Sequence, residues 1–250
     1  GQLIVPKPGG TGRYYIFQTA TNGSAGNRNV LITYSEVDMN LNNGAGDVIV
    51  KKDTLLTHVF CEAQNAVKAS CNSENIWVIT GKDSTNLFYA YLITTAGIQP
   101  PVISASGPVF RGVYIGNTLL DTRQMLKFSP SGKFLIRNQL YGDPPVLYDF
   151  NNSTGVVSNA RSLQSCFGPA SFSPDNSKLY LVNWFGGQVY QYDLCKTPLT
   201  RVLVGTLTTF RWQMQNALDG KIYLMHAGSS NYLSVINTPN AVGAGCNLTA

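Results

Sequence analysis

The chain has 250 residues and a formal net charge of +5, and only 12% of its residues are charged. No basic cluster is longer than Lys51-Lys52, which argues against nucleic-acid binding because such proteins concentrate Lys and Arg in a patch or stripe. No run of 18 apolar residues and no signal peptide is recognisable, so no membrane-spanning helix is predicted. Neutral Asn, Ser, Thr, Gln and Gly supply the polarity, as in many extracellular proteins. The chain begins at Gly1 instead of Met, and we therefore expect it to be processed or a fragment.

Short runs rich in Val, Ile, Tyr, Phe and Thr predict strands along the whole chain, and turns containing Gly, Asn or Pro separate them. The first group of strands is expected at Leu3–Val5, Tyr14–Thr19, Leu31–Val37 and Val48–Leu56. The second is expected in part of His58–Ser70 and at Ile76–Thr80, Leu87–Thr94 and Val102–Val109. No long stretch has the spacing of an amphipathic helix.

Three further groups follow in the second half of the chain. They are expected at Met125–Phe128, Phe134–Arg137, Val146–Phe150 and Val156–Leu163, then at Pro169–Phe172, Leu179–Asn183, Gln188–Leu194 and Thr200–Leu207. The last group holds Phe210–Gln215, Ile222–Met225 and Tyr232–Ile236, and no clear fourth strand follows before the chain ends. An unfinished group suggests either missing sequence or completion by Leu3–Val5 at the other end of the chain.

These three groups repeat one another in sequence. A turn followed by an apolar run recurs so that Lys133, Lys178 and Lys221 stand 45 and 43 residues apart. A second marker, Asp149, Asp193 and Asn237, recurs at intervals of 44. The side chain of Asp or Asn at this point can form a hydrogen bond with the backbone of the following turn, so the marker indicates a structural role.

Four short strands with a period of 40–50 residues are typical of β-propeller blades. The sequence therefore predicts an all-β fold consisting of one β-propeller domain over residues 1–250. About five four-stranded blades are expected at 1–56, 57–110, 111–164, 165–207 and 208–250, the last incomplete. The ring could be a larger one with six or seven blades.

The five cysteines are spaced in a way that argues against a C-x-x-C metal or redox site. Cys61 and Cys71 lie ten residues apart and could close a local loop, while Cys166 and Cys195 bracket the fourth predicted blade and could form a bridge across it. Both pairings fit an oxidising compartment. Cys246 is left over, and the alternative is that all five are free thiols.

An ordered series of segments carries a resemblance to a known family. It includes Leu3-Ile-Val-Pro-Lys-Pro-Gly9, the stretch from Tyr34 to Val48, Phe88-Tyr-Ala-Tyr-Leu-Ile-Thr94 and Ser234-Val-Ile-Asn-Thr-Pro-Asn240. Together they resemble the propeller-like region near the N-terminus of large secreted Bacteroidota proteins, which carry a type B sorting domain for type IX secretion. Many of those proteins are described as gliding-motility or adhesin-like.

The resemblance implies a secreted or cell-surface protein, with more chain on both sides of the part given. It implies partners among other surface proteins or other domains of the same larger chain. Family members often have histidines after segments that match Ala66-Val-Lys68 and Ile76-Trp-Val-Ile-Thr80. Here Ala69, Ser70 and Gly81 stand in those places, so a polar or metal site built on the family's histidines is not expected.

The residues themselves indicate no catalytic site and no cofactor. The sequence has no nucleophile elbow, zinc-protease or P-loop motif. The two histidines, His58 and His226, are expected in different blades and are interpreted as ordinary strand residues. Asp38, Asn40 and Asn42 imitate the start of a calcium loop, but Gly44 comes one place late and Ile49 replaces the closing Glu, which favours a hairpin connection.

Exposed aromatic residues are the remaining candidates for ligand binding. Trp184 and Phe185 fall between two predicted strands, where an exposed aromatic pair is costly unless it is used or covered. Tyr141 and Trp212 are weaker candidates, and packing is the alternative role for all four residues. A flat ring can stack on a sugar face while Asn and Gln bond the hydroxyl groups.

The sequence thus favours a non-enzymatic, secreted or cell-surface propeller module for adhesion or structural interaction, without nucleic-acid binding or membrane insertion. Two alternatives remain: a carbohydrate-binding, lectin-like propeller, and a hydrolase or lyase acting on glycans. Any specific function is expected in segments that do not repeat, such as the Trp184–Phe185 loop.

Overall fold

The structure is a computed structural model that describes residues 2–22, 29–57, 64–70, 73–82, 85–109, 113–115, 118–121, 124–139, 143–208, 211–226 and 232–249. At 21–22, 29–30, 113–115, 118–121, 124, 139 and 211–212 it describes the backbone alone. The described residues form antiparallel sheets joined by turns, with two short 3₁₀ turns and no α-helix among them. None of their helical segments has the length and apolarity needed to span a membrane.

The chain divides into two compact units, and the boundary between them passes through one of the sheets. Unit 1 comprises residues 1–126 and 149–159, and unit 2 comprises 127–148 and 160–250. The sheet at the boundary is formed in the order β12 (Gln124–Phe128), β13 (Phe134–Gln139), β14 (Val146–Asn151) and β15 (Val156–Ser162).

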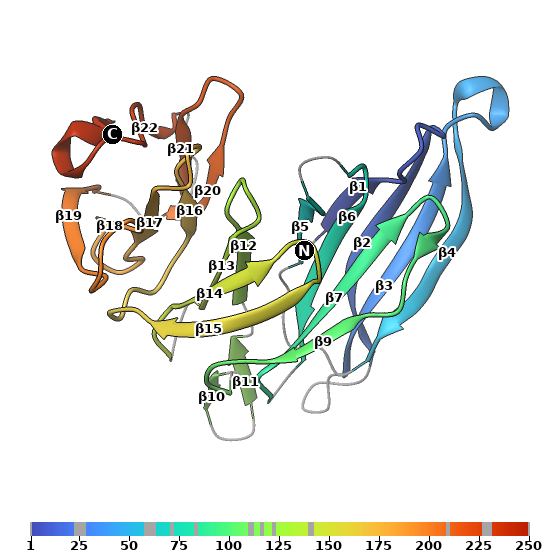
Figure 1. Cartoon of the computed structure of the whole chain (residues 1–250), viewed down its shortest axis with the longest axis horizontal. Coiled ribbons are helices and arrows are strands. Elements are labelled where there is room, and N and C mark those ends of the chain that lie inside the picture. Colours follow the sequence, from blue (N-terminus) through green and yellow to red (C-terminus); the bar gives the residue numbers. More distant parts are fainter. Residues whose placement is uncertain are drawn as a thin grey trace. The chain divides into compact units, whose positions relative to one another are not determined.

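Unit 1 holds two further sheets and a separate hairpin (Figure 1). The first sheet has the order β1 (Gln2–Pro6), β2 (Arg13–Asn22), β3 (Asn29–Asp38) and β4 (Asp47–Leu56), with the 3₁₀ turn η1 (Asn42–Gly44) between β3 and β4. The second has the order β5 (Asn65–Lys68), β6 (Ile76–Gly81) and β7 (Leu87–Thr94), and both β8 (Gly97–Ile98) and β9 (Val102–Ala105) pair with β7. The hairpin of β10 (Val113–Ile115) and β11 (Thr118–Asp121) was not predicted from the sequence.

Unit 2 holds the last two sheets, which also run in chain order. The first of them is formed by β16 (Ala170–Phe172), β17 (Lys178–Val182), β18 (Gln188–Asp193) and β19 (Arg201–Thr206). The other is formed by β20 (Arg211–Asn216), β21 (Ile222–His226), β22 (Ser234–Ile236) and β23 (Leu248–Thr249), with the 3₁₀ turn η2 (Gly243–Cys246) before β23. Each sheet is a simple up-and-down blade, as the repeat predicts.

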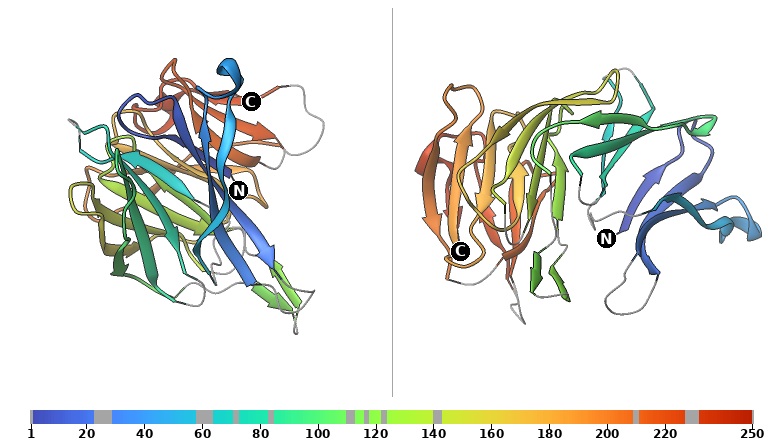
Figure 2. Two further views of the ribbon diagram at one scale, coloured as in Figure 1. Left: turned by 90° about the vertical axis from the view of Figure 1, so that its right-hand side faces the viewer. Right: turned by 90° about the horizontal axis from the view of Figure 1, so that it is seen from below.

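The sheets of unit 2 pack face to face (Figure 2). Side chains of β17 and β18 form one core cluster with side chains of β20, β21 and β22: Tyr180, Val182, Val189, Met214, Ile222, Leu224 and Ile236. All five residues of β17 are buried, because the strand has a neighbouring sheet on each face. Tyr180 of β17 is fully buried in this cluster.

In the fourth predicted blade, the register of β17 and β18 brings the Lys and Asp markers together. Lys178 and Asp193 are paired across the two strands, and the Lys178 Nζ lies 3.3 Å from an Asp193 carboxylate oxygen. The sequence also predicts that Asp193 bonds the backbone of the following turn. This prediction is confirmed, because the oxygen that faces Lys178 also accepts a hydrogen bond from the Cys195 backbone N–H. The marker is therefore part of the scaffold.

The last sheet contains a fourth strand that the sequence analysis did not identify. Leu248 and Thr249 pair with Ile236 and Val235 of β22. A two-residue strand is too short to show an alternating pattern, which explains why it was missed. The segment before it is attached to β17 and β18: the Tyr180 hydroxyl donates to the Pro239 carbonyl, while Gln191 donates to the Ala241 carbonyl and accepts from the Gly243 N–H.

The predicted bridge between Cys166 and Cys195 is not formed, and both residues are free thiols. Cys166 belongs to a core cluster with Phe172 and Leu179, and burial raises its pKa to about 12. Cys195 is exposed in the turn after β18, so one sulfur faces the core and the other faces solvent. Cys246 is also free and buried, whereas Cys61 and Cys71 lie outside the described residues.

Candidate functional site

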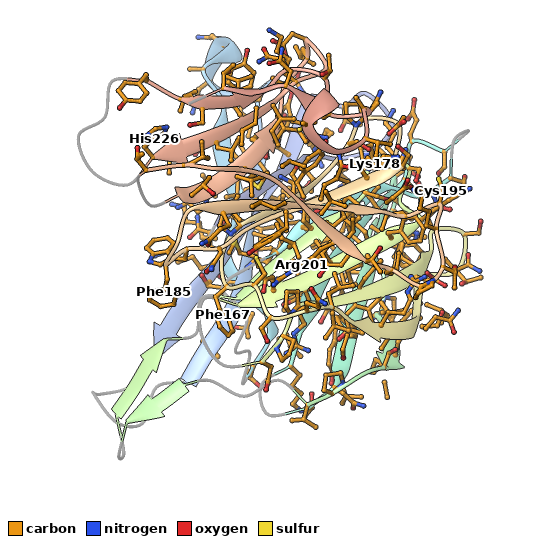
Figure 3. All side chains as sticks on the ribbon, turned by 90° about the vertical axis from the view of Figure 1, so that its left-hand side faces the viewer. Phe167, Lys178, Phe185, Cys195, Arg201 and His226 are labelled. Carbon is orange, nitrogen blue, oxygen red and sulfur yellow. The ribbon has the colours of Figure 1, made fainter. Side chains whose placement is uncertain are left out.

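The loops of unit 2 lie at two opposite ends of its sheets, because each strand reverses the direction of the one before it. The turn end carries the connections β16–β17, β18–β19 and β20–β21. The aromatic end carries the segment before β16 and the connections β17–β18, β19–β20 and β21–β22. Figure 3 shows Phe167, Phe185 and His226 toward one edge of this unit and Lys178 and Cys195 toward the opposite edge.

The β17–β18 loop at the aromatic end is held in one conformation by its own hydrogen bonds. The Asn183 N–H donates to the Gln188 carbonyl at 2.8 Å, and the Gly187 N–H donates to the Asn183 carbonyl at 2.9 Å. The Asn183 side-chain oxygen accepts from the Phe185 N–H at 3.3 Å, while its amide donates to the Gln188 side chain at 2.9 Å. These bonds close a short loop with Trp184 and Phe185 at its start.

Neighbouring segments fix the same loop from two sides. The Trp184 N–H donates to the Phe167 carbonyl at 2.6 Å, and the Leu207 N–H donates to the Gly187 carbonyl at 2.9 Å. Gly187 has a φ of +68°, and a Cβ there would lie 1.9 Å from the Leu207 oxygen. Only glycine fits this approach, so the Gly186-Gly187 pair serves the loop's geometry.

Aromatic rings gather at this end with different degrees of exposure. Phe185 is 57% exposed and Tyr232 is 61% exposed, whereas Phe167 and Trp184 are half-buried. His226 is buried, bonded to the Ser234 hydroxyl at 3.0 Å, and packed edge-on against the Tyr232 ring. The interpretation of His226 as a strand residue is confirmed.

The two central loops of the aromatic end are uncharged. Residues 163–169 and 183–188 contain no Asp, Glu, Lys or Arg. Their polar side chains include the amides of Asn183 and Gln188, and the Gln188 oxygen accepts the Asn183 amide. Within the part of the chain that the structure describes, the Gln188 amide nitrogen donates to no acceptor. The surface thus combines exposed rings with neutral hydrogen-bonding groups.

The four aromatic candidates differ in what the structure shows of them. Trp184 and Phe185 lie in the β17–β18 loop, as predicted. The backbone of Trp212 lies at the start of β20, also at the aromatic end, but its side chain is not among those described. Tyr141 lies outside the described residues. Sequence reasoning missed Phe167 and Tyr232, which could have been found by noting which loops share an end.

At the turn end, the acidic residues are engaged in shaping turns. Asp175 accepts hydrogen bonds from the Ser173 hydroxyl and from the Ser177 N–H and hydroxyl. Asp219 accepts from the Lys221 N–H and the Tyr223 hydroxyl, and these bonds lower its pKa. These carboxylates act as turn formers.

Unit 1 contains a cluster of opposite charges at one end of its first sheet. Glu36 and Asp38 are buried two residues apart on β3, and both contact Arg13 of β2. The Arg13 Nε lies 2.9 Å from Asp38, and the Lys7 Nζ lies 3.1 Å from Glu36. Two neighbouring buried carboxylates are a candidate for acid–base chemistry, but each of them is already paired with a cation.

The resemblance of Asp38, Asn40 and Asn42 to a calcium loop does not extend to their geometry. One Asp38 oxygen accepts from the Asn40 N–H and amide, and the other accepts from Arg13. The Asn40 N–H, together with its amide and the Arg13 cation, holds the Asp38 pKa below its usual range. Asn42 donates to the Gly46 carbonyl instead. The described residues contain no group of three His, Cys, Asp or Glu side chains that could hold a metal ion.

Lys127 is a charged residue on the first strand of its sheet, and the sequence analysis did not single it out. Lys127 of β12 donates to the Met214 carbonyl of β20 at 2.5 Å and lies 3.3 Å from the Gln215 side-chain oxygen. Burial lowers the pKa of its amine to about 8. Because both acceptors are on β20, Lys127 links the first strands of two sheets.

No family model and no curated protein matches the chain. Several solved structures are similar to it. A candidate 6-phosphogluconolactonase from Bacteroides uniformis is 14% identical, with a TM-score of 0.57 over 98% of this chain and 69% of that one. The periplasmic gluconolactonase PpgL of Pseudomonas aeruginosa is 12% identical, with a TM-score of 0.56 over 92% of this chain and 66% of that one.

A third similar structure comes from a nidogen/laminin complex, with 12% identity and a TM-score of 0.50 over 100% of this chain and 92% of that one. At such low identity these likenesses concern the fold. Together with the four-stranded sheets, they confirm that the chain has the predicted all-β, β-propeller fold.

Proposed function

We propose that this chain is the recognition module of an extracytoplasmic protein and that it binds its partner through the aromatic end of unit 2. The observation that carries the proposal is Phe185, which is 57% exposed on a loop whose backbone is fixed by internal hydrogen bonds and by a required glycine. An exposed ring costs solvation free energy unless a partner covers it. A fixed loop loses little conformational entropy on binding.

The proposed role is adhesion or structural interaction at the cell surface. The resemblance to secreted Bacteroidota proteins supports this location, and the periplasmic origin of the similar Pseudomonas aeruginosa structure supports a place outside the cytoplasm. The structure from the nidogen/laminin complex supports an interaction role, because that propeller-like chain occurs in an assembly of proteins. Partners would be other surface molecules or other domains of a longer chain.

Binding of labelled protein to fixed Bacteroidota cells, measured by flow cytometry, tests the proposal. The wild type is compared with Phe185→Ser and with Leu218→Ser. Leu218 is a suitable control because it is a fully exposed apolar residue in the β20–β21 turn, at the turn end. We expect a loss of about tenfold or more for Phe185→Ser and no change for Leu218→Ser. Absence of binding, or equal binding by all three proteins, would contradict the proposal.

An enzymatic role is the second candidate, and two observations favour it. Two of the similar structures are named as lactonases, and Glu36 and Asp38 bring two buried carboxylates together. The cations beside them weaken the case, since a glycan-cleaving pair needs one protonated carboxyl group whereas both carboxylates are paired with cations, Glu36 with Lys7 and Asp38 with Arg13. The test measures hydrolysis of 6-phosphogluconolactone and release of reducing ends from polysaccharides. Turnover that disappears in Glu36→Gln would establish the enzyme and displace the first proposal.

A further inference from the structure

We infer that the ligand of the aromatic end is a neutral glycan, an inference that rests on the proposed recognition function and names its ligand class. The relevant surface consists of the segment 163–169 and the loop 183–188, which the bond from the Trp184 N–H to the Phe167 carbonyl holds together. The question is which ligand chemistry this surface complements.

The electrostatic character of the surface points to an uncharged ligand. Neither of its segments contains a charged residue, although the chain as a whole carries a net charge of +5. An anionic ligand is normally held by Arg or Lys, and protein interfaces are enriched in Arg beside their aromatic residues. A cation that contacts the segment 163–169, Arg201 of β19, is already engaged: its guanidinium donates to the Ser165 carbonyl at 2.9 Å and lies 4.0 Å from the centre of the Tyr190 ring. Charge complementarity therefore favours a neutral ligand.

The polar groups beside the ring fit sugar hydroxyls. Gln188 packs against Gly186, since a Cβ at Gly186 would lie 2.5 Å from the Gln188 amide nitrogen. Its position is fixed by the bond to Asn183, and its own amide donates to nothing else among the described residues. A hydroxyl group both donates and accepts, so it can bond this amide at little desolvation cost.

The ring supplies the other half of the recognition. Phe185 is 57% exposed and is followed by two glycines, Gly186 and Gly187. The C–H face of a pyranose is flat and apolar, and it packs on an aromatic ring of this size. The exposed ring and the neutral amide occur three residues apart in one loop that is fixed by its own hydrogen bonds.

A glycan array tests this inference when it carries neutral glucans, mannans and galactans beside sialylated and sulfated forms. We expect neutral glycans to be bound, with a loss of about tenfold in Phe185→Ser, retention in Phe185→Trp, and a several-fold loss in Gln188→Leu. Leu218→Ser and Gln2→Leu are matched controls: they make the corresponding changes at exposed positions in the turn end and on β1, and should bind as the wild type does. Thermal melts establish that each variant is folded.

The outcomes separate the inference from the proposed function. Preference for acidic glycans would overturn the inference of a neutral ligand. A second outcome is that no glycan on the array is bound, while cell binding still depends on Phe185 and disappears after protease treatment of the cells. The partner would then be a protein. The inference of a glycan ligand would be wrong, and the proposed recognition function would stand. A blank array together with cell binding that does not depend on Phe185 would overturn both.

Discussion

The two ends of unit 2 use their side chains in opposite ways. At the turn end, the repeated residues satisfy one another: Lys178 pairs with Asp193, and Asp175 bonds the two serines beside it. At the aromatic end, the loop residues do not repeat, their backbone bonds fix the loop, and Phe185 remains exposed. Recurring residues therefore belong to the scaffold of this unit, while the rigid, non-repeating loops are available to contact a partner. Four substitutions test this contrast between the two ends.

Gly187→Ala should be the most damaging of these changes to stability. The new Cβ would lie 1.9 Å from the Leu207 oxygen and would also occupy an unfavourable φ of +68°. We expect a loss of about 3 kcal/mol or more in the free energy of unfolding. Gly220→Ala is the matched control: its φ is +78° and nothing lies within 4 Å, so it should cost only about 1 kcal/mol. Urea denaturation measures both, and equal losses would show that the close approach is unimportant.

Gln191→Leu should break the attachment of the C-terminal segment to β17 and β18. The Gln191 amide bonds the Tyr180 hydroxyl and the Ala241 carbonyl, and its oxygen accepts from the Gly243 N–H. Leaving these buried groups unpaired should cost about 2–3 kcal/mol. Gln213→Leu, at an exposed position on β20, should cost less than about 0.5 kcal/mol. Similar denaturation midpoints for the two variants would contradict this role.

Lys178→Met removes the cation that pairs with Asp193, and we expect a loss of about 1–2 kcal/mol at pH 7, between the values for exposed and buried ion pairs. Although burial opposes ionisation of Asp193, the Cys195 N–H and Lys178 outweigh it and lower its pKa. The folded state therefore binds fewer protons than the unfolded state, so this stabilisation is present above the ordinary pKa of about 4 and is lost as pH falls through the lower folded pKa. Urea denaturation of both proteins at pH 7 and pH 3 should show the difference shrinking; a constant difference would mean that the pair does not stabilise the fold.

Phe185→Ser should leave stability within about 0.5 kcal/mol of the wild type, because the ring is mostly exposed. Phe172→Ser, at a fully buried ring in the same sheet, should in contrast cost several kcal/mol. Thermal melting compares the two. A large loss for Phe185→Ser would make this ring part of the core and would remove the reason to assign it to binding.

The sequence is sufficient to predict the propeller and the position of the Trp184–Phe185 loop, because the period and the turn residues are local signals. Three features depend on contacts that no local signal reports. The two-residue strand β23 exists through its pairing with β22. The Cys166–Cys195 bridge failed because spacing does not reveal that Cys166 faces the core while Cys195 faces solvent. Phe167 joins the candidate site through a backbone bond to Trp184, at a distance of seventeen residues along the chain.

The most direct test of the contrast between the two ends is hydroxyl-radical footprinting of the unmodified chain, free and bound to cells. Both Phe185 and Leu218 are exposed in the free chain, one at each end of unit 2, so both should be oxidised. Binding through the aromatic end predicts that Phe185 becomes protected while oxidation of Leu218 is unchanged. Protection of Leu218, or unchanged oxidation of Phe185 in the bound chain, would contradict the account.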